Sequence, residues 1–402
     1  MRQLDVVLKV ADRCNLACPY CYYFFKENQL HKDSAALISK DTVRAVGAFL
    51  SEAADSHRLE RVFVGLHGGE PLLLPPARLE ACCMEIREAL EGRADVQFAL
   101  QTNGVLINED WIGVFERQGI HVGVSLDGPK AVNDRNRPDH KGRGSYDKTV
   151  AGLRKLQQAY VQGRITQPGV LCVADVDTDG AETVRHLVED LGVVSLDLLL
   201  PREGHESTIV GRQADWIAYF NGVLKYWVAV NRQTPVTLRL FSDILGSFAG
   251  EAAAAQRDTA RSNRHNILTI MADGGLGIDD NVMALDARLA TGGMNVREHS
   301  LGDFLATDVM QELMGAVGRP PEACSSCEWF RVCRGGELYN RFSRSTGFDN
   351  PSVFCPTLKT LNAFFARVAS RNGLHIQQVA DLLNTTPVTS VQDLRNLEPA
   401  TA

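Results

Sequence analysis

Six short runs of β-branched and other apolar residues recur along the first half of this chain, and helix-like stretches separate them. The runs are residues 5–10, 61–67, 96–102, 120–126, 169–175 and 193–200. The helix-like stretches include residues 40–55, 77–91, 108–118, 146–161 and 179–191. Strands that alternate with helices form parallel βαβ units, because the crossover helix returns the chain to the same end of the sheet. The sequence therefore predicts an α/β fold that either curls into a barrel or winds into an open sheet.

Polar or glycine-rich segments follow the first four of these runs. They are RCNLACPYC at 13–21, HGGEP at 67–71, QTNG at 101–104 and SLDGP at 125–129. The carboxyl ends of parallel strands share one rim, and functional residues gather there. Four such segments on one rim indicate a single active site, although QTNG and SLDG taken alone are also typical of turns.

Seven of the ten cysteines fall into two clusters. The first has the spacing C-x3-C-x2-C and consists of Cys14, Cys18 and Cys21. The second has the spacing C-x2-C-x5-C-x21-C and consists of Cys324, Cys327, Cys333 and Cys355. Three thiolates on one loop can hold three irons of a 4Fe–4S cluster and leave the fourth open, whereas four thiolates close all four irons. The alternatives are a zinc site completed by a distant histidine at the first cluster and a four-cysteine structural zinc at the second. Cys82, Cys83 and Cys172 are expected to be small buried hydrophobic residues.

The composition excludes several classes of partner. The 402 residues carry 42 basic and 49 acidic side chains, a formal charge of -7, which argues against nucleic-acid binding and fits a basic peptide better. No stretch approaches the ~18 continuous apolar residues of a membrane span, and the first residues lack the apolar run of a secretory signal. We therefore expect a cytoplasmic protein, where clustered thiols are metal ligands or catalysts more often than disulfides.

Together these motifs resemble those of radical S-adenosylmethionine (SAM) enzymes with a C-terminal SPASM-type domain. The resemblance implies a partial (β/α)6 barrel of the TIM type and a first 4Fe–4S cluster, held by the three cysteines at 14–21, whose open iron binds SAM. Tyr20 would lie against adenine, and Gly68, Gly69 and Glu70 would form the GGE segment that receives the SAM amino group. The same resemblance places Gln101, Asn103, Ser125 and Asp127 near the SAM carboxylate and ribose. Arg137 would pair with the carboxylate, although a solvated surface arginine is the alternative.

The second cysteine cluster resembles the auxiliary cluster of the SPASM module, which is suited to electron transfer or to holding a loop-rich segment together. Full SPASM enzymes carry one more auxiliary cluster. In this chain Glu337 and Asp279 stand where two of its cysteines would be expected. We therefore predict two 4Fe–4S clusters, one SAM-binding and one auxiliary.

Four further segments resemble one subgroup, the Xye/Grr/Fxs-type maturases, which form three-residue cyclophanes in ribosomally made precursor peptides. They are LLPREGHE at 199–206, LRLFSDILGSFAG at 238–250, DDNVMALDARLATGG at 279–293 and GFDNPSVFCPTLKTL at 347–361. In that subgroup the 5′-deoxyadenosyl radical removes a hydrogen from a β-carbon, which then bonds to an aromatic ring. The ring must lose one electron and one proton afterwards. Asp280 is the predicted base and Asp279 the second choice, with a turn-capping carboxylate as the alternative for both.

The domain organisation follows from the same resemblance. We expect the radical SAM barrel over 1–215, a connecting and substrate-covering region over 216–318, a SPASM-like cluster domain over 319–365, and a helix and tail over 366–402. The expected partners are a precursor peptide and an electron donor such as a ferredoxin or flavodoxin.

Three rival functions share part of this pattern. Another SPASM-type peptide modification, such as a thioether crosslink, β-carbon hydroxylation or formylglycine-type oxidation, needs the same first cluster. A radical SAM enzyme for a small molecule fits the C-terminal third less well, and a zinc-stabilised binding scaffold would contain no labile sulfide. His67, beside the GGE segment, is either a substrate ligand or a packed loop histidine.

Overall fold

The computed structural model describes residues 2–26, 30–32, 34–248 and 267–383. Two compact units make up the chain, and neither is continuous in sequence. Unit 1 consists of Met1–Cys172 and Asn263–Leu313, and unit 2 of Val173–Ser262 and Met314–Ala402.

Unit 1 is built on a mainly parallel sheet with the strand order β5-β4-β3-β2-β1-β8-β9. Its strands are β1 (Gln3–Ala11), β2 (Arg61–Gly68), β3 (Asp95–Thr102), β4 (His121–Ser125), β5 (Gly169–Val173), β8 (Ile267–Ile270) and β9 (Leu276–Gly277). All pair in parallel except β9, which is antiparallel to β8. The register of β1 against β2 shifts between Lys9 and Ala11, an irregularity of the kind that bends a strand where it leaves the sheet.

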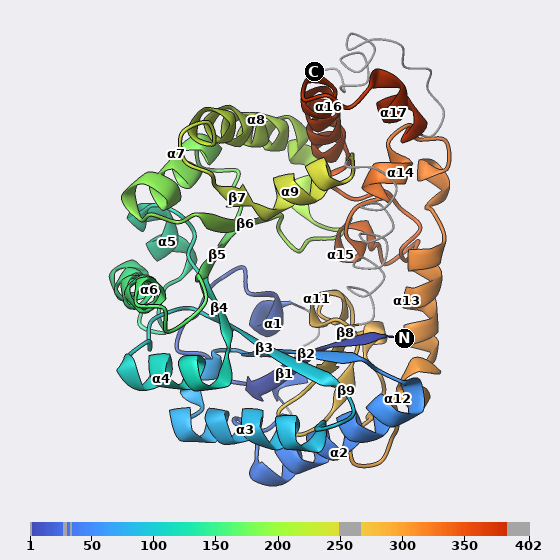
Figure 1. Ribbon diagram of the computed structural model, residues 1–402. Coiled ribbons are helices and arrows are strands. Elements are labelled where there is room, and N and C mark those ends of the chain that lie inside the picture. The colour runs from blue at the N-terminus through green and yellow to red at the C-terminus, as the bar shows by residue number, and fades with distance from the viewer. Residues whose placement is uncertain (1, 27–29, 33, 249–266, 384–402) are drawn as a thin grey trace. The chain divides into compact units, whose positions relative to one another are not determined.

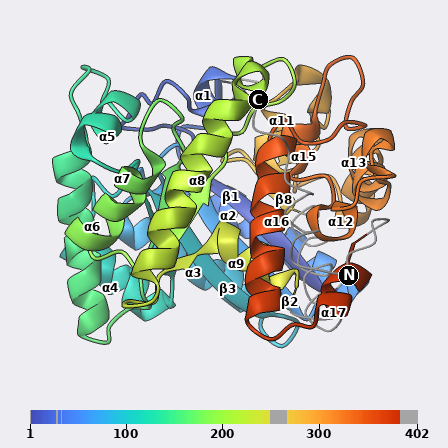
Figure 2. The ribbon, with the colours of Figure 1, turned by 90° about the horizontal axis from the view of Figure 1, so that it is seen from above.

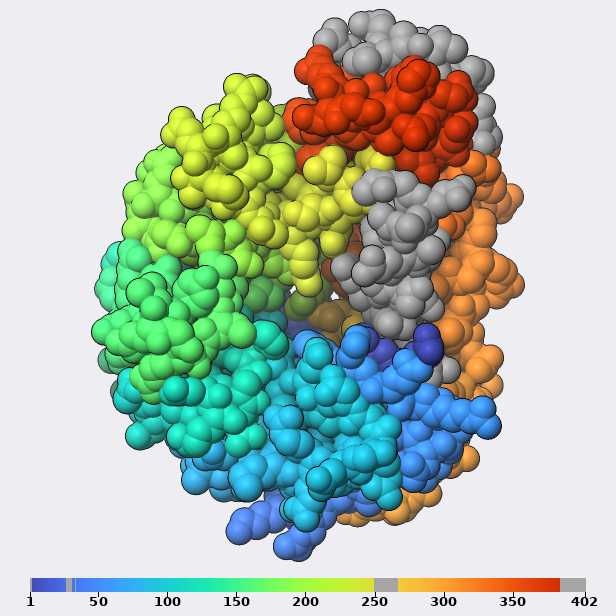
Figure 3. Space-filling model, viewed as in Figure 1, coloured from blue at the N-terminus to red at the C-terminus, as the bar shows by residue number. Residues whose placement is uncertain are grey.

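Helices follow the strands of unit 1, and the longer ones cover the outer side of the sheet (Figure 1). They are α1 (Tyr22–Phe25), α2 (Lys40–His57), α3 (Pro76–Ala89), α4 (Glu109–Gln118), α5 (Lys130–Asn136), α6 (Tyr146–Val161), α11 (Asp280–Met283) and α12 (Leu301–Leu305). Local sequence fixes several ends: Ser39 caps α2, Asn108 caps α4, and Gly119 ends α4 in the left-handed conformation. Helix α3 packs against both α2 and α4, and the residues of these helices form a continuous outer surface (blue to cyan in Figure 3).

The core of unit 1 follows the alternation expected for strands. In β1, Leu4, Val6 and Leu8 are buried, and the intervening residues are more accessible until the strand nears its end. Lys9 breaks this pattern, because its side chain is fully buried. A buried lysine requires a partner, which the candidate site supplies.

Unit 2 is mostly helical. Its elements are α7 (Gly180–Arg185), β6 (Ser195–Leu199), α8 (Gln213–Val230), β7 (Thr237–Leu238), α9 (Arg239–Gly246), α14 (Phe330–Cys333), α15 (Leu338–Arg341), α16 (Cys355–Arg371) and α17 (Ile376–Asp381), while α13 (Asp308–Gly318) begins in unit 1 and ends in unit 2. The main-chain amide of Ala174 donates to Leu199 of β6, which pairs in parallel with β7. Helices α8, α9 and α16 lie together (Figure 2) and share a cluster of aromatic rings that includes Trp227, Phe241 and Phe365.

The predicted α/β fold with a partial parallel sheet is confirmed. Each of the six predicted strands overlaps an observed one, and the five predicted helical stretches correspond to α2, α3, α4, α6 and the region of α7. The sequence did not predict β8 and β9, which add to the sheet beside β1. The domain boundaries expected at residues 215, 318 and 365 separate regions with different expected functions, and they stay predictions. Among the described residues, no helix is long and apolar enough to cross a membrane.

Candidate functional site

The first three cysteines lie on the loop between β1 and α1. Cys14, Cys18 and Cys21 are half-buried and lie close together: Cys18 and Cys21 raise the pKa of Cys14 electrostatically, and Cys21 raises that of Cys18. Burial is the largest cause and raises the pKa of Cys14 to about 12 and that of Cys18 to about 11. Thiolates crowded in this way need a bound cation, so the loop fits three ligands of an iron-sulfur cluster.

The GGE segment lies directly against the chain that leads into the cysteine loop. The amide of Gly69 donates to the carbonyl of Ala11 at 2.7 Å, and the amide of Glu70 donates to that of Arg13 at 2.8 Å. A Cβ atom at Gly69 would be 2.3 Å from the Arg13 oxygen, so only glycine allows this approach. The GGE segment therefore holds two parts of the rim together, and its expected role toward the SAM amino group stays a prediction.

The side chain of Glu70 is buried and bonded within the protein. Its carboxylate accepts from the amide of Leu72 at 3.0 Å, the hydroxyl of Thr102 at 2.7 Å and the amide of Asn103 at 2.8 Å. Burial raises its pKa to about 7, against the opposing effect of these hydrogen bonds. Glu70 therefore ties the end of β2 to the end of β3.

The QTNG segment continues this rim toward the cysteines. The side-chain amide nitrogen of Asn103 donates to the side-chain oxygen of Asn15 at 2.7 Å and lies 3.9 Å from the sulfur of Cys14. Gln101 donates to the hydroxyl of Ser125 at 3.1 Å, which links β3 to β4. Four residues that were predicted to lie near SAM thus belong to one connected rim of unit 1: Glu70, Gln101, Asn103 and Ser125.

Tyr20, Asp127 and Arg137 form a second connected group beside Cys18. The Tyr20 hydroxyl donates to Asp127 at 2.6 Å, and the guanidinium of Arg137 pairs with the same carboxylate at 3.0 and 3.1 Å. The guanidinium also lies 5.5 Å from the centre of the Tyr20 ring and lowers the pKa of Cys18. Arg137 is therefore a buried, ion-paired residue, which excludes the alternative of a solvated surface arginine.

A buried ion pair that the sequence did not predict lies next to this rim. The ammonium of Lys9 contacts the carboxylate of Asp280 on α11, and the same carboxylate oxygen accepts from the hydroxyl of Tyr22 at 2.8 Å. Lys9 also lies 3.0 Å from Nδ1 of His67 and 4.1 Å from the ring centre of Tyr23. Lysine within an apolar strand was the signal that could have revealed this group, because such a residue needs a buried acidic partner.

The two candidate bases differ in their surroundings. Asp280 is 3% exposed and belongs to the Lys9 ion pair. Asp279 caps α11, and its carboxylate accepts from the amide and the side chain of Asn281 at 3.0 and 2.7 Å. The capping alternative therefore describes Asp279, whereas Asp280 faces charged and polar side chains.

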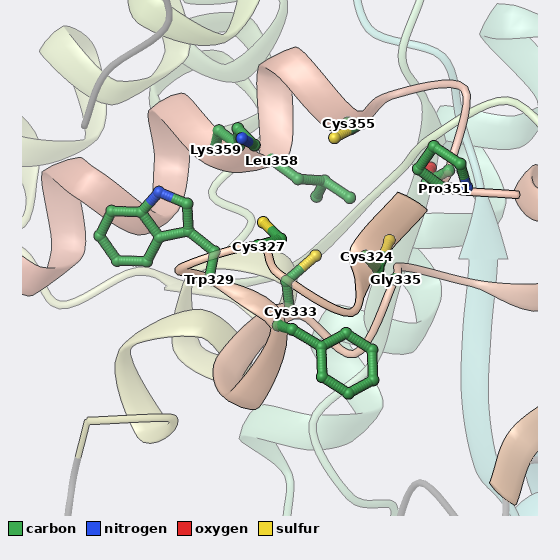
Figure 4. A pocket seen from close by; sticks show the side chains of 11 residues that line it. Cys324, Cys327, Trp329, Cys333, Gly335, Pro351, Cys355, Leu358 and Lys359 are labelled. Carbon is green, nitrogen blue, oxygen red and sulfur yellow. The ribbon is translucent and has the colours of Figure 1, made fainter. Parts of the chain in front are cut away.

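In unit 2 the second group of cysteines lines one partly open cavity (Figure 4). The side chains of Cys324, Cys327, Cys333 and Cys355 converge on it. Burial raises the pKa of both Cys324 and Cys355 to about 11. An all-cysteine donor set fits a 4Fe–4S cluster and is shared by structural zinc sites. In the described part of the chain, no three His, Cys, Asp or Glu side chains lie close enough together to hold a single metal ion.

The remaining sequence predictions concern isolated residues. Cys82, Cys83 and Cys172 are almost completely buried, as expected for small hydrophobic residues. Glu337 precedes α15. His67 is half-buried and hydrogen-bonded to Lys9, which agrees with a packed histidine and leaves a role toward substrate untested.

Comparisons with known proteins agree with this geometry. Residues 8–171 match the sequence model of the Radical SAM superfamily. The chain is 22% identical over 386 residues to the cysteine-type anaerobic sulfatase-maturating enzyme of Clostridium novyi, covering 92% of this chain and 96% of that enzyme. It is 32% identical over 162 residues to the serine-type enzyme of Bacteroides thetaiotaomicron, covering 40% of this chain and 38% of the relative.

Two solved structures resemble this one along most of the chain. Native anSMEcpe with bound AdoMet and Cp18Cys peptide has a TM-score of 0.75 at 20% identity, covering 92% of this chain and 99% of its own. SuiB from Streptococcus suis, bound to the precursor peptide SuiA, has a TM-score of 0.55 at 15% identity, covering 88% and 76%. At these identities the likeness shows the fold alone.

Residues 8–171 therefore resemble a radical SAM domain, and the fold of most of the chain resembles that of the solved relatives. The name of this superfamily and the AdoMet bound in one solved relative agree with the predicted SAM cofactor.

Proposed function

We propose that the chain is a radical SAM maturase that oxidises a side chain at its β-carbon in a peptide substrate. The observation that carries this proposal is the buried Lys9–Asp280–Tyr22 group beside the cysteine loop, because its carboxylate lies next to the rim that we propose binds SAM. The names of the relatives also support a peptide substrate, since they mature sulfatases or were solved with a bound peptide.

The cofactors are assigned to this chain as follows. Cys14, Cys18 and Cys21 hold the first 4Fe–4S cluster, and the rim of GGE, QTNG, Tyr20 and Arg137 surrounds SAM. Bound there, SAM supplies a 5′-deoxyadenosyl radical that removes a hydrogen atom from the substrate. The four cysteines of unit 2 hold the auxiliary cluster, and a reduced ferredoxin or flavodoxin delivers the electron that starts the reaction.

The substrate radical must then lose one electron and one proton. The proton goes to Asp280, because this carboxylate is buried, contacts Tyr22 next to Cys21, and is held in place by Lys9. Asp279 is the weaker candidate, since Asn281 occupies its carboxylate in a helix cap. The auxiliary cluster, if held by the four cysteines of unit 2, would accept the electron.

Two products are compatible with this sequence of steps. The first candidate is a three-residue cyclophane, in which the β-carbon bonds to an aromatic ring. It is supported by the four sequence segments that resemble the Xye/Grr/Fxs-type maturases. Glu337 and Asp279, which stand at the positions of missing cysteines, also support it. Formylglycine is the second candidate, supported by the names of the sulfatase-maturating relatives.

Coexpression with a precursor peptide encoded beside this gene, under low oxygen, distinguishes the two products by tandem mass spectrometry. We expect the peptide to lose two hydrogens and fragmentation to stop across three residues that begin with an aromatic one. An aldehyde that reacts with hydroxylamine would instead establish formylglycine. A variant with alanine at Cys14, Cys18 and Cys21 is the control, and modification by this variant would contradict a radical SAM mechanism.

A further inference from the structure

Two positively charged side chains lie beside the four-cysteine cavity of unit 2. Lys359 lines the cavity one helical turn after Cys355 on α16 (Figure 4). Arg341 is the last residue of α15 and packs next to Gly335, one of the residues that line the cavity. A Cβ atom placed on Gly335 would lie 3.6 Å from the side chain of Arg341. Both are therefore close to any cluster that the cysteines hold.

The two cations together act on all four thiols. Arg341 interacts electrostatically with Cys324 and Cys333, whereas Lys359 interacts with Cys324, Cys327 and Cys355. Each of the four ligands is therefore influenced by at least one of the two cations.

Asp349 acts on Arg341 electrostatically, but among the described residues no carboxylate lies within hydrogen-bond distance of its guanidinium. The side chain is 4% exposed, and its guanidinium donates to the carbonyls of Phe348 at 2.8 and 3.1 Å and Ala316 at 3.1 Å. Carbonyl oxygens satisfy the N–H groups without neutralising the cation. Because the site is buried, this charge acts over a longer distance than it would in water.

Lys359 has an acidic neighbour that opposes it. Its ammonium lies 3.3 Å from the carboxylate of Glu328, which follows Cys327 in sequence. Lys359 lines the cavity whereas Glu328 is absent from its lining residues, so the ammonium is the more direct influence on the cavity. The pair therefore provides two opposite charges that can be removed one at a time.

We propose that Arg341 and Lys359 raise the reduction potential of the auxiliary cluster and thereby make it the acceptor of the substrate's electron. The proposal rests on the function proposed above. In the step concerned, the substrate radical gives one electron to the oxidised cluster and one proton to Asp280, and the reduced cluster carries one more negative charge. Nearby cations stabilise the more negative state, and net charge around a cluster is among the factors that set its potential.

The test is an EPR-monitored redox titration of the full chain with alanine at Cys14, Cys18 and Cys21, so that only the auxiliary cluster contributes. Lys359→Gln is expected to favour the oxidised cluster about tenfold, which for one electron lowers the midpoint potential by about 59 mV. Glu328→Gln is expected to raise the potential, and the double variant to return toward the starting value. Lys225→Gln, an exposed residue of α8, is the control and should leave the potential unchanged.

The opposite signs separate electrostatics from structural damage. If both single variants shift the potential in the same direction, or neither shifts it, the inference is wrong. Should Lys359→Gln fail to hold iron, Glu328→Gln decides alone, and an unchanged or lower potential contradicts the inference. Zinc without sulfide in the starting protein would instead remove the auxiliary cluster from the proposed function itself.

Discussion

Lys9 shows how one residue can depend on a partner far along the chain. It is fully buried in β1 and neutralised by Asp280, 271 positions later. Removing one member of a buried pair leaves an uncompensated charge, which costs about 3–5 kcal/mol. We therefore expect Lys9→Met and Asp280→Asn each to lower the free energy of unfolding by about that amount in urea titrations.

The double variant tests whether the two residues act as a pair. Its loss of stability should be clearly smaller than the sum of the single losses, because no unpaired charge remains. Lys148→Met, at an exposed position of α6, is the control and should change stability little. Additive losses in the double variant would contradict the pairing.

Asp280→Asn also has a catalytic consequence. An amide cannot take the proton that the substrate radical must lose, so we expect SAM to be cleaved to 5′-deoxyadenosine while modified peptide falls at least a hundredfold, within the usual effect of general bases. Both products are measured by chromatography in one reaction. Asp279→Asn is the matched variant and should keep most of the activity, and full activity of Asp280→Asn would exclude it as the base.

Glu70 gives the protein a predictable pH dependence. Burial raises its pKa in the folded state to about 7, above the ordinary value of 4.5. Between these two pH values the folded protein therefore keeps a proton on Glu70 that the unfolded chain has lost. Stability from this group is therefore complete below about pH 4.5 and is lost as the pH rises through 7, by about 3 kcal/mol in total. Glu70→Gln should remove this part of the slope, as urea unfolding from pH 5 to 8 would show. Identical slopes for the two proteins would contradict the assignment.

At the scale of elements, α6 holds the QTNG segment in place. Thr149 of this helix donates to the carbonyl of Asn103 at 2.9 Å, and a Cβ atom on Gly152 would be 2.1 Å from the carbonyl of Gly104. Gly152→Ala must therefore shift the segment, and we expect SAM to bind about tenfold more weakly, or about 1.4 kcal/mol, in equilibrium binding measurements.

Gly113→Ala is the matched control for this prediction. Gly113 lies within α4, and its new methyl group would meet only the movable end of Arg117 at 3.0 Å. The Gly113→Ala variant should bind SAM as the unchanged protein does. It should also be slightly more stable, since alanine has a higher helix propensity than glycine. Equal binding by both variants would mean that α6 does not position this part of the rim.

The elements that the sequence predicted are those with a clear local signal. β-branched runs and the polar segments behind them located β1 to β6 and the rim, because burial and strand geometry impose a pattern of their own. The strands β8 and β9 have four and two residues, too few for any periodicity to show. The partners of Lys9 and of Arg341 depend on contacts between distant segments, which no local pattern encodes.

At the scale of the whole molecule, the metal content tests the assignment of both cysteine clusters. Two 4Fe–4S clusters correspond to about eight irons and eight sulfides per chain in anaerobically reconstituted protein. Alanine at Cys324 and Cys327 should remove about half of each and leave SAM cleavage measurable. Iron that stays at about four in the unchanged protein, or zinc in its place, would contradict two clusters.

The interrupted course of unit 1 also imposes an order on synthesis. Strand β1 pairs with β8 on one side, yet the ribosome must complete residues 12–266 before β8 exists. Until then the nascent chain presents an unpaired edge of β1 carrying a lysine whose counter-ion has not been made. A transcript truncated before residue 267 would leave that edge open permanently, so premature termination should yield aggregates rather than a smaller folded enzyme.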